Sequence, residues 1–471
     1  MVVDRQELIA RITREVVARL SEEPSGAARL APGDGVFATV DEAVAAAGAA
    51  QKRVAAMSLA DRGRMCDIVR RVCADNAPEL ARIELAETTL GRVDHKIVKL
   101  RNIRYILGTE AMTSQAMSDS TGLCVIEHAP WGVIGMVLPA THCVPTLASN
   151  AINILAAGNT AVFSPHPAGA KVTALGLQMF NREIERELGV ANVLTTMAEP
   201  TTQAAEEIFA HPGVALLCVT GGAGLVKAAS RFGKRVIAAG PGNPPVVVDE
   251  TADLDLAARS IILGAGFDNN ILCIAEKEIF VVERVADAFI DAMRRAGALE
   301  LDRGAIDRLT QAAFRFDPDG TPHVNKEYVG KDTAVLARAA GISLLSATDL
   351  LFGETEESHP FVQEEQMMPF VPVVRFAGVD AAIAASVKAE HGYRHTAIIH
   401  SRNVENVTKM GRAMNCTLFV QNAPSYGSLG IGSPGYSSHS IATPTGEGVT
   451  TPLTFTRERR LVVGGGALRI V

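Results

Sequence analysis

The stretch that decides the fold is GVIGMVLPATHCVPTLASNAINILAAGNTAVFS, residues 132–164. It begins and ends with apolar runs, at 132–138 and 160–164, and between them lies a segment that starts at Pro145 and stops at Gly158. Strands that are covered on both faces are continuously apolar, and parallel strands need a crossover that is usually a helix. The stretch therefore predicts a buried strand–helix–strand unit.

Residues 128–170 contain no Asp, Glu, Lys or Arg, which is also a property of membrane spans. Five prolines and three asparagines interrupt this segment, so no run of about 20 apolar residues remains to cross a bilayer. We expect no membrane contact, and the missing charge is explained by burial inside a parallel sheet.

The same alternation of strands and helices continues on both sides of this unit. Long helices are expected at 41–57 and 59–76, before it, and the pattern after it predicts a doubly wound parallel sheet. The expected strands and helices after it are 170–188, 192–197, 215–220, 246–249, 253–267, 278–283, 284–297, 371–376 and 396–401. The series beyond Cys273 is long enough for a second α/β domain.

Composition excludes several classes of protein. The 471 residues hold 45 Lys plus Arg against 52 Asp plus Glu, a net charge of -7 without a long basic block, so neither nucleic acid nor an anionic membrane is an expected partner. The seven cysteines are an odd number, widely spaced and without a CxxC pair. This argues against a disulfide framework and a zinc site, and we expect a reducing compartment and no metal.

The N-terminal segment 4–20 predicts an amphipathic helix, followed by a flexible tether at 21–35. This segment lacks the continuous apolar region that a secretory signal contains. Two roles remain open for the helix: it packs on its own domain, or it docks in a groove of a partner. Its apolar stripe consists of Leu8, Ile9, Ile12, Val16 and Leu20.

Cys273 is the candidate reactive cysteine, because it lies between an expected helix and an expected strand, whereas Cys218 and Cys416 lie inside apolar runs. The preceding residues 268–270, Asp-Asn-Asn, could donate amide hydrogen bonds to charge that develops near the thiol. A Thr-Gly-Gly turn at 220–222 could approach a pyrophosphate, but it lacks the full dinucleotide fingerprint.

Several long motifs, in the order and spacing of one family, identify the chain as similar to the aldehyde dehydrogenase superfamily, and most of all to its CoA-acylating branch. The resemblance runs from about residue 40 to the C-terminus. It is carried by the segments 131–167, 219–226, 239–257, 267–281 (FDNNILCIAEKEIFV), 364–376 and 441–460 (IATPTGEGVTTPLTFTRERR).

The resemblance implies a role for particular residues. Cys273 matches the nucleophile that attacks the aldehyde to form a thiohemiacetal. The carbon of this thiohemiacetal passes a hydride to a nicotinamide, which leaves a thioester on the cysteine. Glu365 matches the glutamate that binds the nicotinamide ribose. The turn Thr220, Gly221 and Gly222 would lie against the pyrophosphate, and Ser164 and His166 beside the adenosine half of the cofactor.

Three departures from the family pattern affect the expected chemistry. Hydrolytic members carry a general-base glutamate where this chain has Ala239, so water should be activated poorly and the thioester should pass to coenzyme A. Ser164 replaces a ribose-binding lysine, which favours NAD over NADP. In the expected oxyanion hole, His142 replaces an asparagine; either His142 donates to the carbonyl oxygen, or Thr141 or the backbone does so while His142 is packed elsewhere.

The expected organisation is an aldehyde dehydrogenase-like α/β fold with a doubly wound parallel-sheet cofactor domain, an α/β catalytic domain and a small β oligomerisation segment. The expected boundaries are 1–20 for a targeting helix, 21–35 for the linker, 36–112 and 131–240 for the cofactor domain, 241–444 for the catalytic domain, and 113–130 and 445–471 for oligomerisation.

The family also implies a homo-oligomer, a dimer or a tetramer, and a location in the bacterial cytoplasm inside a microcompartment, with residues 4–20 bound to a shell protein. The expected reaction converts a short aldehyde, propionaldehyde first and acetaldehyde second, with CoA and NAD to acyl-CoA and NADH. Three alternatives stay open: a hydrolytic NAD(P)-dependent aldehyde dehydrogenase, a cysteine acyltransferase without redox chemistry, and a catalytically silent scaffold.

Overall fold

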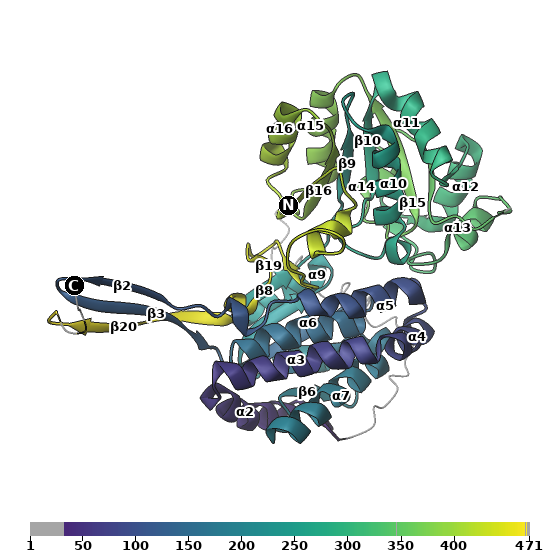
Figure 1. Cartoon of the computed structure of the whole chain (residues 1–471). Helices are drawn as coiled ribbons and strands as arrows, with labels where there is room; N and C mark the ends of the chain where they lie inside the picture. Colours follow the sequence, from purple (N-terminus) through teal and green to yellow (C-terminus); the bar gives the residue numbers. More distant parts are fainter. Residues whose placement is uncertain (1–32, 345, 467, 469–471) are drawn as a thin grey trace, which may run out of the picture. The chain divides into compact units, whose positions relative to one another are not determined.

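The computed structural model describes residues 33–344, 346–466 and 468, and the chain divides into two compact units (Figure 1). Unit 1 comprises Met1–Val69, Gly108–Ala238 and Pro452–Val471, and unit 2 comprises Arg70–Leu107 and Ala239–Thr451. The predicted helix at 4–20 and most of the tether at 21–35 lie outside the described residues.

These units are divided differently from the expected domains at three places, one of which is residues 239–240, expected in the cofactor domain and found in unit 2. Arg70–Leu107, assigned to the cofactor domain from the sequence, belongs to unit 2, because helix α5 (Val93–Asn102) directs buried lysines at the loop before Cys273. Residues 445–451, assigned to the oligomerisation segment, also belong to unit 2. The division of the chain into a cofactor domain and a catalytic domain remains a prediction about function.

Unit 1 contains a six-stranded sheet in the order β1-β6-β5-β4-β7-β8. From β4 the chain proceeds outward to β5 and β6, and then returns to place β7 on the other side of β4, with parallel pairing throughout this stretch. This is the predicted doubly wound arrangement, with its topological switch between β4 and β7. The strands are β1 (Val36–Phe37), β4 (Val133–Leu138), β5 (Thr160–Pro165), β6 (Leu194–Met197), β7 (Val214–Thr220) and β8 (Arg235–Ala239).

Helix α6 (Cys143–Ala156) is the predicted crossover between β4 and β5, and each of its residues is buried. Burial on all sides accounts for the absence of charge from this stretch. The helix begins at Cys143, two residues before Pro145, where the sequence placed its start. The first turn can include this proline because the N–H groups of the first turn have no intrahelical acceptor. The other long helices around this sheet are α2 (Val40–Ala56), α3 (Leu59–Asp75), α7 (Ala170–Leu188), α8 (Thr202–Ala210) and α9 (Ala223–Ala229).

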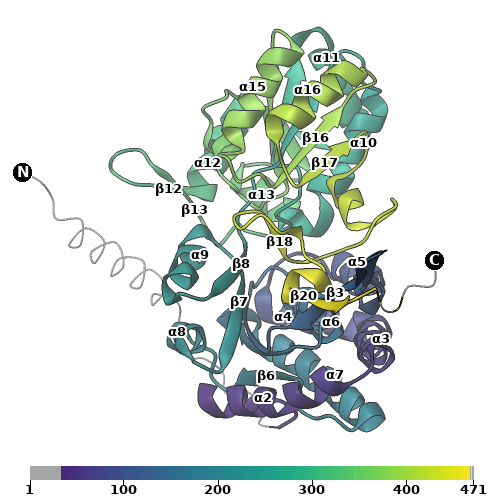
Figure 2. The same ribbon diagram turned by 90° about the vertical axis from the view of Figure 1, so that its left-hand side faces the viewer.

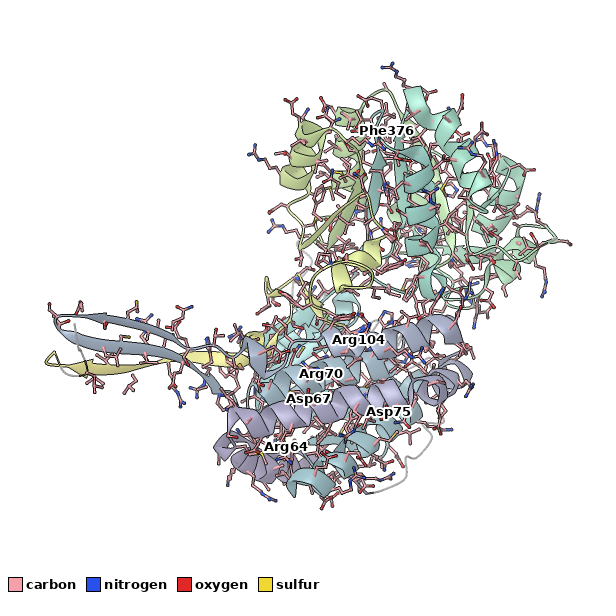
Figure 3. All side chains as sticks on the ribbon, in the orientation of Figure 1. Arg64, Asp67, Arg70, Asp75, Arg104 and Phe376 are labelled. Carbon is pink, nitrogen blue, oxygen red and sulfur yellow. The ribbon has the colours of Figure 1, made fainter. Side chains whose placement is uncertain are left out.

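Helix α3 shows how the polar and apolar residues of these helices are sorted. Arg64, Asp67, Arg70 and Asp75 follow one another along its visible side (Figure 3), while Met65, Ile68 and Val69 are buried. The helix was expected from the sequence, and the structure adds which of its residues face the core.

Unit 2 contains a seven-stranded sheet in the order β11-β14-β15-β10-β9-β16-β17, whose pairs are all parallel. Successive residues of one strand enter different cores: Val246 and Val248 pack in one cluster and Val247 in another. Both faces are thus covered, by α10 and α11 on one side and by α15 and α16 on the other (Figures 1 and 2).

The strands of this sheet are β9 (Pro245–Val248), β10 (Glu278–Val282), β11 (Leu299–Glu300), β14 (Leu351–Glu354), β15 (Phe370–Phe376), β16 (Thr396–His400) and β17 (Leu418–Gln421). The helices of unit 2 besides α5 are α4 (Ala77–Thr88), α10 (Leu254–Ala265), α11 (Glu283–Arg295), α12 (Arg303–Ala313), α13 (Thr333–Ala339), α14 (Pro360–Gln363), α15 (Val379–Ala389) and α16 (Val404–Met414).

The segment 113–130 and the C-terminal tail form one antiparallel sheet, β2 (Gln115–Asp119), β3 (Gly122–Pro130) and β20 (Thr456–Gly464), with β3 in the middle. In Figure 1 this sheet projects away from the six-stranded sheet of unit 1. Met117, Leu461 and Val462 are exposed on it. The paired hairpins are β12 (Phe314–Phe316) with β13 (Pro322–Val324), and β18 (Ile441–Ala442) with β19 (Gly448–Val449).

Short 3-10 helices complete the two units: η1 (Ile103–Tyr105), η2 (Thr109–Ala111), η3 (Pro167–Gly169), η4 (Ser230–Phe232), η5 (Phe267–Asn270), η6 (Ser425–Leu429) and η7 (Pro452–Phe455). Among the described residues, no helix combines the length and the hydropathy that crossing a bilayer requires.

Candidate active site

Cys273 lies in the loop that joins η5 to β10, where the sequence placed it, and its side chain is half-buried. Burial, together with the carboxyl of Glu365, raises the pKa of the thiol to about 12, while Lys277 and the backbone N–H groups of Cys273 and Ile274 act in the opposite direction. The resting cysteine is therefore protonated, and the groups that favour its thiolate are already in place.

Glu365 lies in the same unit as Cys273, in the loop between α14 and β15. One of its carboxyl oxygens accepts a hydrogen bond from the backbone N–H of Gly242 at 3.3 Å. Burial raises the pKa of Glu365 to about 7, although the positive charge of Lys277 lowers it. The structure thus brings together two of the predicted site residues, Cys273 and Glu365, near a cation that the sequence reading missed.

That cation, Lys277, is fully buried four residues after the cysteine. Its ammonium donates to the backbone oxygens of Asn270 and Leu272, at 2.8 and 3.2 Å, and to Oδ1 of Asn270 at 2.6 Å. Burial lowers the pKa of Lys277 to about 8, although Glu365 and Cys273 raise it. The sequence signal that could have pointed to it is a lysine between two glutamates, Glu276 and Glu278, at the start of an apolar strand and close to the candidate nucleophile.

Gly242 and His395 complete the surroundings of the cysteine loop. A Cβ atom on Gly242 would lie 2.7 Å from the carbonyl oxygen of Cys273 and 2.9 Å from Cγ of His395. The ring of His395 is buried; its Nδ1 lies 2.8 Å from Oγ1 of Thr396, and its Nε2 has no hydrogen-bond partner among the described residues. Burial and Lys277 lower its pKa to about 4, so the resting imidazole is neutral.

The amides next to the cysteine do something other than expected. Asn269 donates to the backbone oxygen of Gly330 and to Asp332, at 3.0 and 2.8 Å, and Asn270 donates to the backbone oxygens of Ala265 and Glu276, each at 2.9 Å. The prediction that they donate to charge near the thiol is wrong, because their N–H groups are used to hold the loop.

The other cysteines also fall partly outside expectation. Cys218 is buried in β7, as predicted for a core residue. Cys416 is half-buried rather than enclosed in a core, and its thiol donates to the backbone oxygen of Leu418 at 3.1 Å. Among the described residues, no group of three or more His, Cys, Asp or Glu is arranged to hold a metal ion.

The remaining predicted site residues belong to unit 1, at the carboxyl ends of adjacent strands. Ser164 is buried at the end of β5, and His166 follows it and accepts the N–H of Ala168 on its Nδ1 at 3.1 Å. Thr141 and His142 lie between β4 and α6, Thr141 half-buried and His142 buried.

The Thr-Gly-Gly turn ends the third of these adjacent strands. Thr220 is the last residue of β7, Gly221 follows it, and Gly222 caps α9 and is exposed, with nothing within 4 Å of a Cβ built on it. The three groups thus gather along one edge of the sheet at its topological switch, where open α/β sheets bind ligands. Their roles stay predictions.

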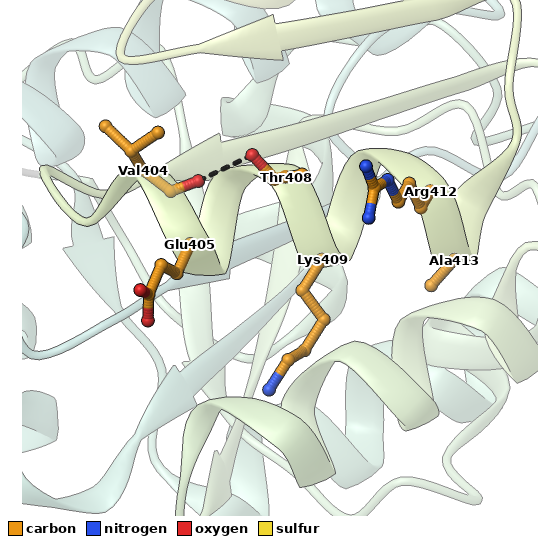
Figure 4. A pocket seen from close by; sticks show the side chains of 6 residues that line it. All are labelled: Val404, Glu405, Thr408, Lys409, Arg412 and Ala413. Atoms are coloured by element: carbon orange, nitrogen blue, oxygen red, sulfur yellow. Dashed lines mark hydrogen bonds between the residues drawn. The ribbon is translucent and has the colours of Figure 1, made fainter.

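An open hollow on α16 is unrelated to these residues (Figure 4). Thr408 there donates to the backbone oxygen of Val404 at 2.8 Å, and Lys409 pairs with Asp380 at 2.6 Å. Since none of its lining residues is a predicted site residue, we assign it no role in the chemistry. Its lining residues are Val404, Glu405, Thr408, Lys409, Arg412 and Ala413.

Comparison with known proteins gives a consistent picture. The model of the aldehyde dehydrogenase family matches residues 23–313. The acetaldehyde dehydrogenase (acetylating) EutE of Salmonella typhimurium is 42% identical over 469 residues, covering 99% of this chain and 100% of the relative. The propanal dehydrogenase (CoA-propanoylating) of Citrobacter freundii is 40% identical over 450 residues, covering 95% and 96%.

Solved structures agree with these sequence relatives. The Rhodopseudomonas palustris propionaldehyde dehydrogenase with bound propionyl-CoA superposes with a TM-score of 0.89 at 41% identity, covering 92% of this chain and 96% of that one. A propionaldehyde dehydrogenase from the Clostridium phytofermentans fucose utilisation bacterial microcompartment gives a TM-score of 0.90 at 38% identity, covering 93% and 100%. The chain therefore belongs to the aldehyde dehydrogenase family, and within it to the CoA-acylating branch.

Proposed function

We propose that this protein converts a short-chain aldehyde, coenzyme A and NAD to acyl-CoA, NADH and a proton, with Cys273 as the nucleophile. The observation that carries the proposal is that the half-buried Cys273 and Glu365 and the buried Lys277 lie in one unit and shift one another's pKa, in a chain that has no carboxylate at position 239. The relatives that match almost the whole chain are acylating acetaldehyde and propanal dehydrogenases.

The chain's own residues supply the nucleophile and its environment. The Cys273 sulfur attacks the aldehyde carbon beside Lys277, and the thiol proton passes to the aldehyde oxygen, which gives a thiohemiacetal. A bound nicotinamide would accept the hydride that leaves this carbon, and the proton of the hydroxyl group is released. The result is a thioester on Cys273, which the thiol of coenzyme A releases as acyl-CoA while the cysteine is regenerated. We propose Nε2 of His395, neutral and without a partner among the described residues, as an acceptor for the proton of the incoming thiol.

Release to coenzyme A rather than to water follows from position 239. Ala239 is the last residue of β8 and only 4% exposed, so this position supplies no carboxylate to activate water. A positioned general base contributes about 10²- to 10⁴-fold to such a step, and water without one competes poorly with a thiol.

The residues of unit 1 fit a dinucleotide. Ser164, Thr220, Gly221 and Gly222 lie at the carboxyl ends of β5 and β7, on either side of β4, and the exposed turn at Gly222 lets the backbone come close to a phosphate. The serine at 164 supplies no charge for a 2′-phosphate, so we propose NAD. An engineered glycolyl-CoA reductase, 41% identical, was solved with NADP+ bound, which makes this preference worth measuring.

In unit 2, Glu365 would hold the nicotinamide ribose: the single backbone donor from Gly242 leaves carboxylate lone pairs for ribose hydroxyls. For the oxyanion hole we keep both possibilities, the side chain of His142 or that of Thr141 with the backbone. Propionaldehyde is the first substrate to test and acetaldehyde the second, since the relatives act on one or the other.

We also propose that the enzyme is a homo-oligomer, built through the exposed sheet β2-β3-β20, and that residues 4–20 attach it to a microcompartment shell protein in the bacterial cytoplasm. The exposed Met117, Leu461 and Val462 support the first part. The microcompartment origin of one structural relative supports the second.

A coupled assay tests the proposed function directly. NADH absorbance is followed with propionaldehyde, with acetaldehyde, and with NADP in place of NAD, each with and without CoA. Absorbance that rises only with CoA is the expected result. Equal rates without CoA would establish a hydrolytic enzyme, and no rate under any condition would favour an acyltransferase or a scaffold.

A further inference from the structure

The loop that carries Cys273 has an unusual backbone. Asp268, Asn269 and Asn270 have φ angles of 50°, 54° and 67°, so three consecutive residues other than glycine lie in the left-handed region. Asn and Asp enter this region as single residues, and each such residue costs on the order of 1 kcal/mol. A run of three persists only when the surrounding structure fixes it.

Asp268 is fixed by a buried charge cluster from helix α5 and the residues before it. Its Oδ1 accepts the backbone N–H of Arg92 at 2.7 Å, its Oδ2 accepts the ammonium of Lys99, and Lys96 lies 3.6 Å from Oδ2. Lys96 in turn pairs with the buried Glu84 at 2.9 Å. All four side chains are buried to 1% exposure or less, where an unpaired charge would be very costly.

The next two residues are held by amide hydrogen bonds. Asn269 reaches Gly330 and Asp332, and Asn270 ties the end of α10 to the residue before Lys277 through Ala265 and Glu276. Every side chain in the left-handed run therefore makes at least two hydrogen bonds to parts of unit 2 outside the run.

Lys277, which follows the cysteine in the chain, binds the residues that precede it. Its ammonium has three acceptors, all of them on residues 270 and 272, so it binds the end of the left-handed run and the residue immediately before Cys273. A buried ammonium with three well-placed acceptors fixes the direction of the backbone that it binds. The direction of the N–H groups of Cys273 and Ile274, which face the sulfur, depends on that backbone.

From this geometry we propose that Lys99 with Asp268, and Lys277 with Asn270, are two clamps that position the nucleophile: they hold the left-handed run 268–270 and the two residues after it in a conformation that aims the Cys273 sulfur and the N–H groups beside it. They are positioning residues, since they touch the loop and not the substrate. The inference rests on the proposed role of Cys273 as the nucleophile.

Glycine substitution separates the anchor from the backbone conformation. Asn270→Gly keeps a residue for which φ near +67° is easy, but it removes both side-chain anchors. The matched control is Asn415→Gly, which replaces another left-handed asparagine of unit 2, at the end of α16. Lys277→Met removes the second clamp.

The readout is the rate at which iodoacetamide alkylates Cys273, followed as a function of pH by mass spectrometry of its peptide, with kcat and KM measured in parallel. We expect Asn270→Gly and Lys277→Met to slow alkylation and lower kcat by about 10- to 100-fold, the range for a nucleophile misplaced by up to about 1 Å. For Lys277→Met the alkylation profile should also move to higher pH, because a cation that favours the thiolate is lost.

The Asn415→Gly control should stay within about twofold of the wild type, as changes remote from the reacting atoms do. Alkylation and kcat of Asn270→Gly equal to those of Asn415→Gly would overturn the proposal, and this comparison remains decisive if Lys277→Met does not fold. Because alkylation needs neither aldehyde nor CoA, it also distinguishes failure of the clamp from failure of the proposed reaction: an enzyme without NADH formation but with clamp-dependent alkylation would refute only the latter.

Discussion

Gly242→Ala is the substitution whose effect can be worked out most fully from the structure. The added Cβ would stand 2.7 Å from the carbonyl oxygen of Cys273 and 2.9 Å from Cγ of His395, well inside van der Waals contact. The cysteine loop and the histidine must both move, by roughly 0.7 and 0.5 Å, to restore an ordinary contact distance. Gly242 has no left-handed backbone to disturb, so the clash is the only perturbation of the folded structure.

The expected consequence is a loss of activity larger than the loss of stability. Overpacking of this kind costs about 1 to 3 kcal/mol of folding free energy, partly offset by about 0.4 to 1 kcal/mol from the lower entropy of the unfolded chain. A shift of the nucleophile by a fraction of an ångström should reduce kcat by about 10- to 100-fold. The N–H of residue 242 still donates to Glu365, so NAD binding should change less than kcat.

The assay compares NADH formation, NAD affinity and the melting temperature of Gly242→Ala with those of Gly378→Ala. Gly378 also lies in unit 2, has an extended backbone with φ of -167°, and offers open space to a Cβ. The control should behave like the wild type. If Gly242→Ala retains a kcat within about twofold of the control, the added Cβ is accommodated without displacing the Cys273 sulfur, and the expected effect is refuted.

Four further predictions address the nucleophile, the missing base, pH and the N-terminus. Cys273→Ala should abolish NADH formation and leave NAD binding nearly intact; turnover above about a hundredth of wild type would exclude it as the nucleophile. Ala239→Glu should release more free acid per NADH, measured by chromatography, provided that the variant folds with a carboxylate at a site only 4% exposed; a folded variant with unchanged acid output would show that the missing base does not control the outcome. Burial raises the pKa of Glu276 from 4.5 to about 7, so the folded chain keeps a proton that the unfolded chain releases and stability falls as pH rises between these values; Glu276→Gln should flatten that slope in denaturant melts, which an unchanged slope would contradict. Deleting residues 1–20 should leave turnover and melting temperature unchanged and abolish co-purification with shell proteins; an earlier melt or dissociation into monomers would assign the segment to the enzyme's own fold.

The sequence alone determined the elements and the class of fold. Burial on both faces leaves a parallel strand no polar position, so the runs at 132–138, 160–164 and 246–249 could be recognised one at a time. Family motifs are local stretches of chain, so Cys273 and Glu365 could also be located without knowing what surrounds them.

Only the tertiary structure decided what surrounds the cysteine. Helix α5 joins unit 2 because Lys96 and Lys99 meet Asp268, about 170 residues away in the chain, and no local pattern encodes that meeting. The role of Asn269 and Asn270 was misjudged for the same reason, since an amide next to a nucleophile in sequence is equally able to face the thiol or the backbone behind it. Periodicity reports which face of an element is buried, whereas the partners of a buried charge depend on contacts between distant segments, which form only when the chain folds.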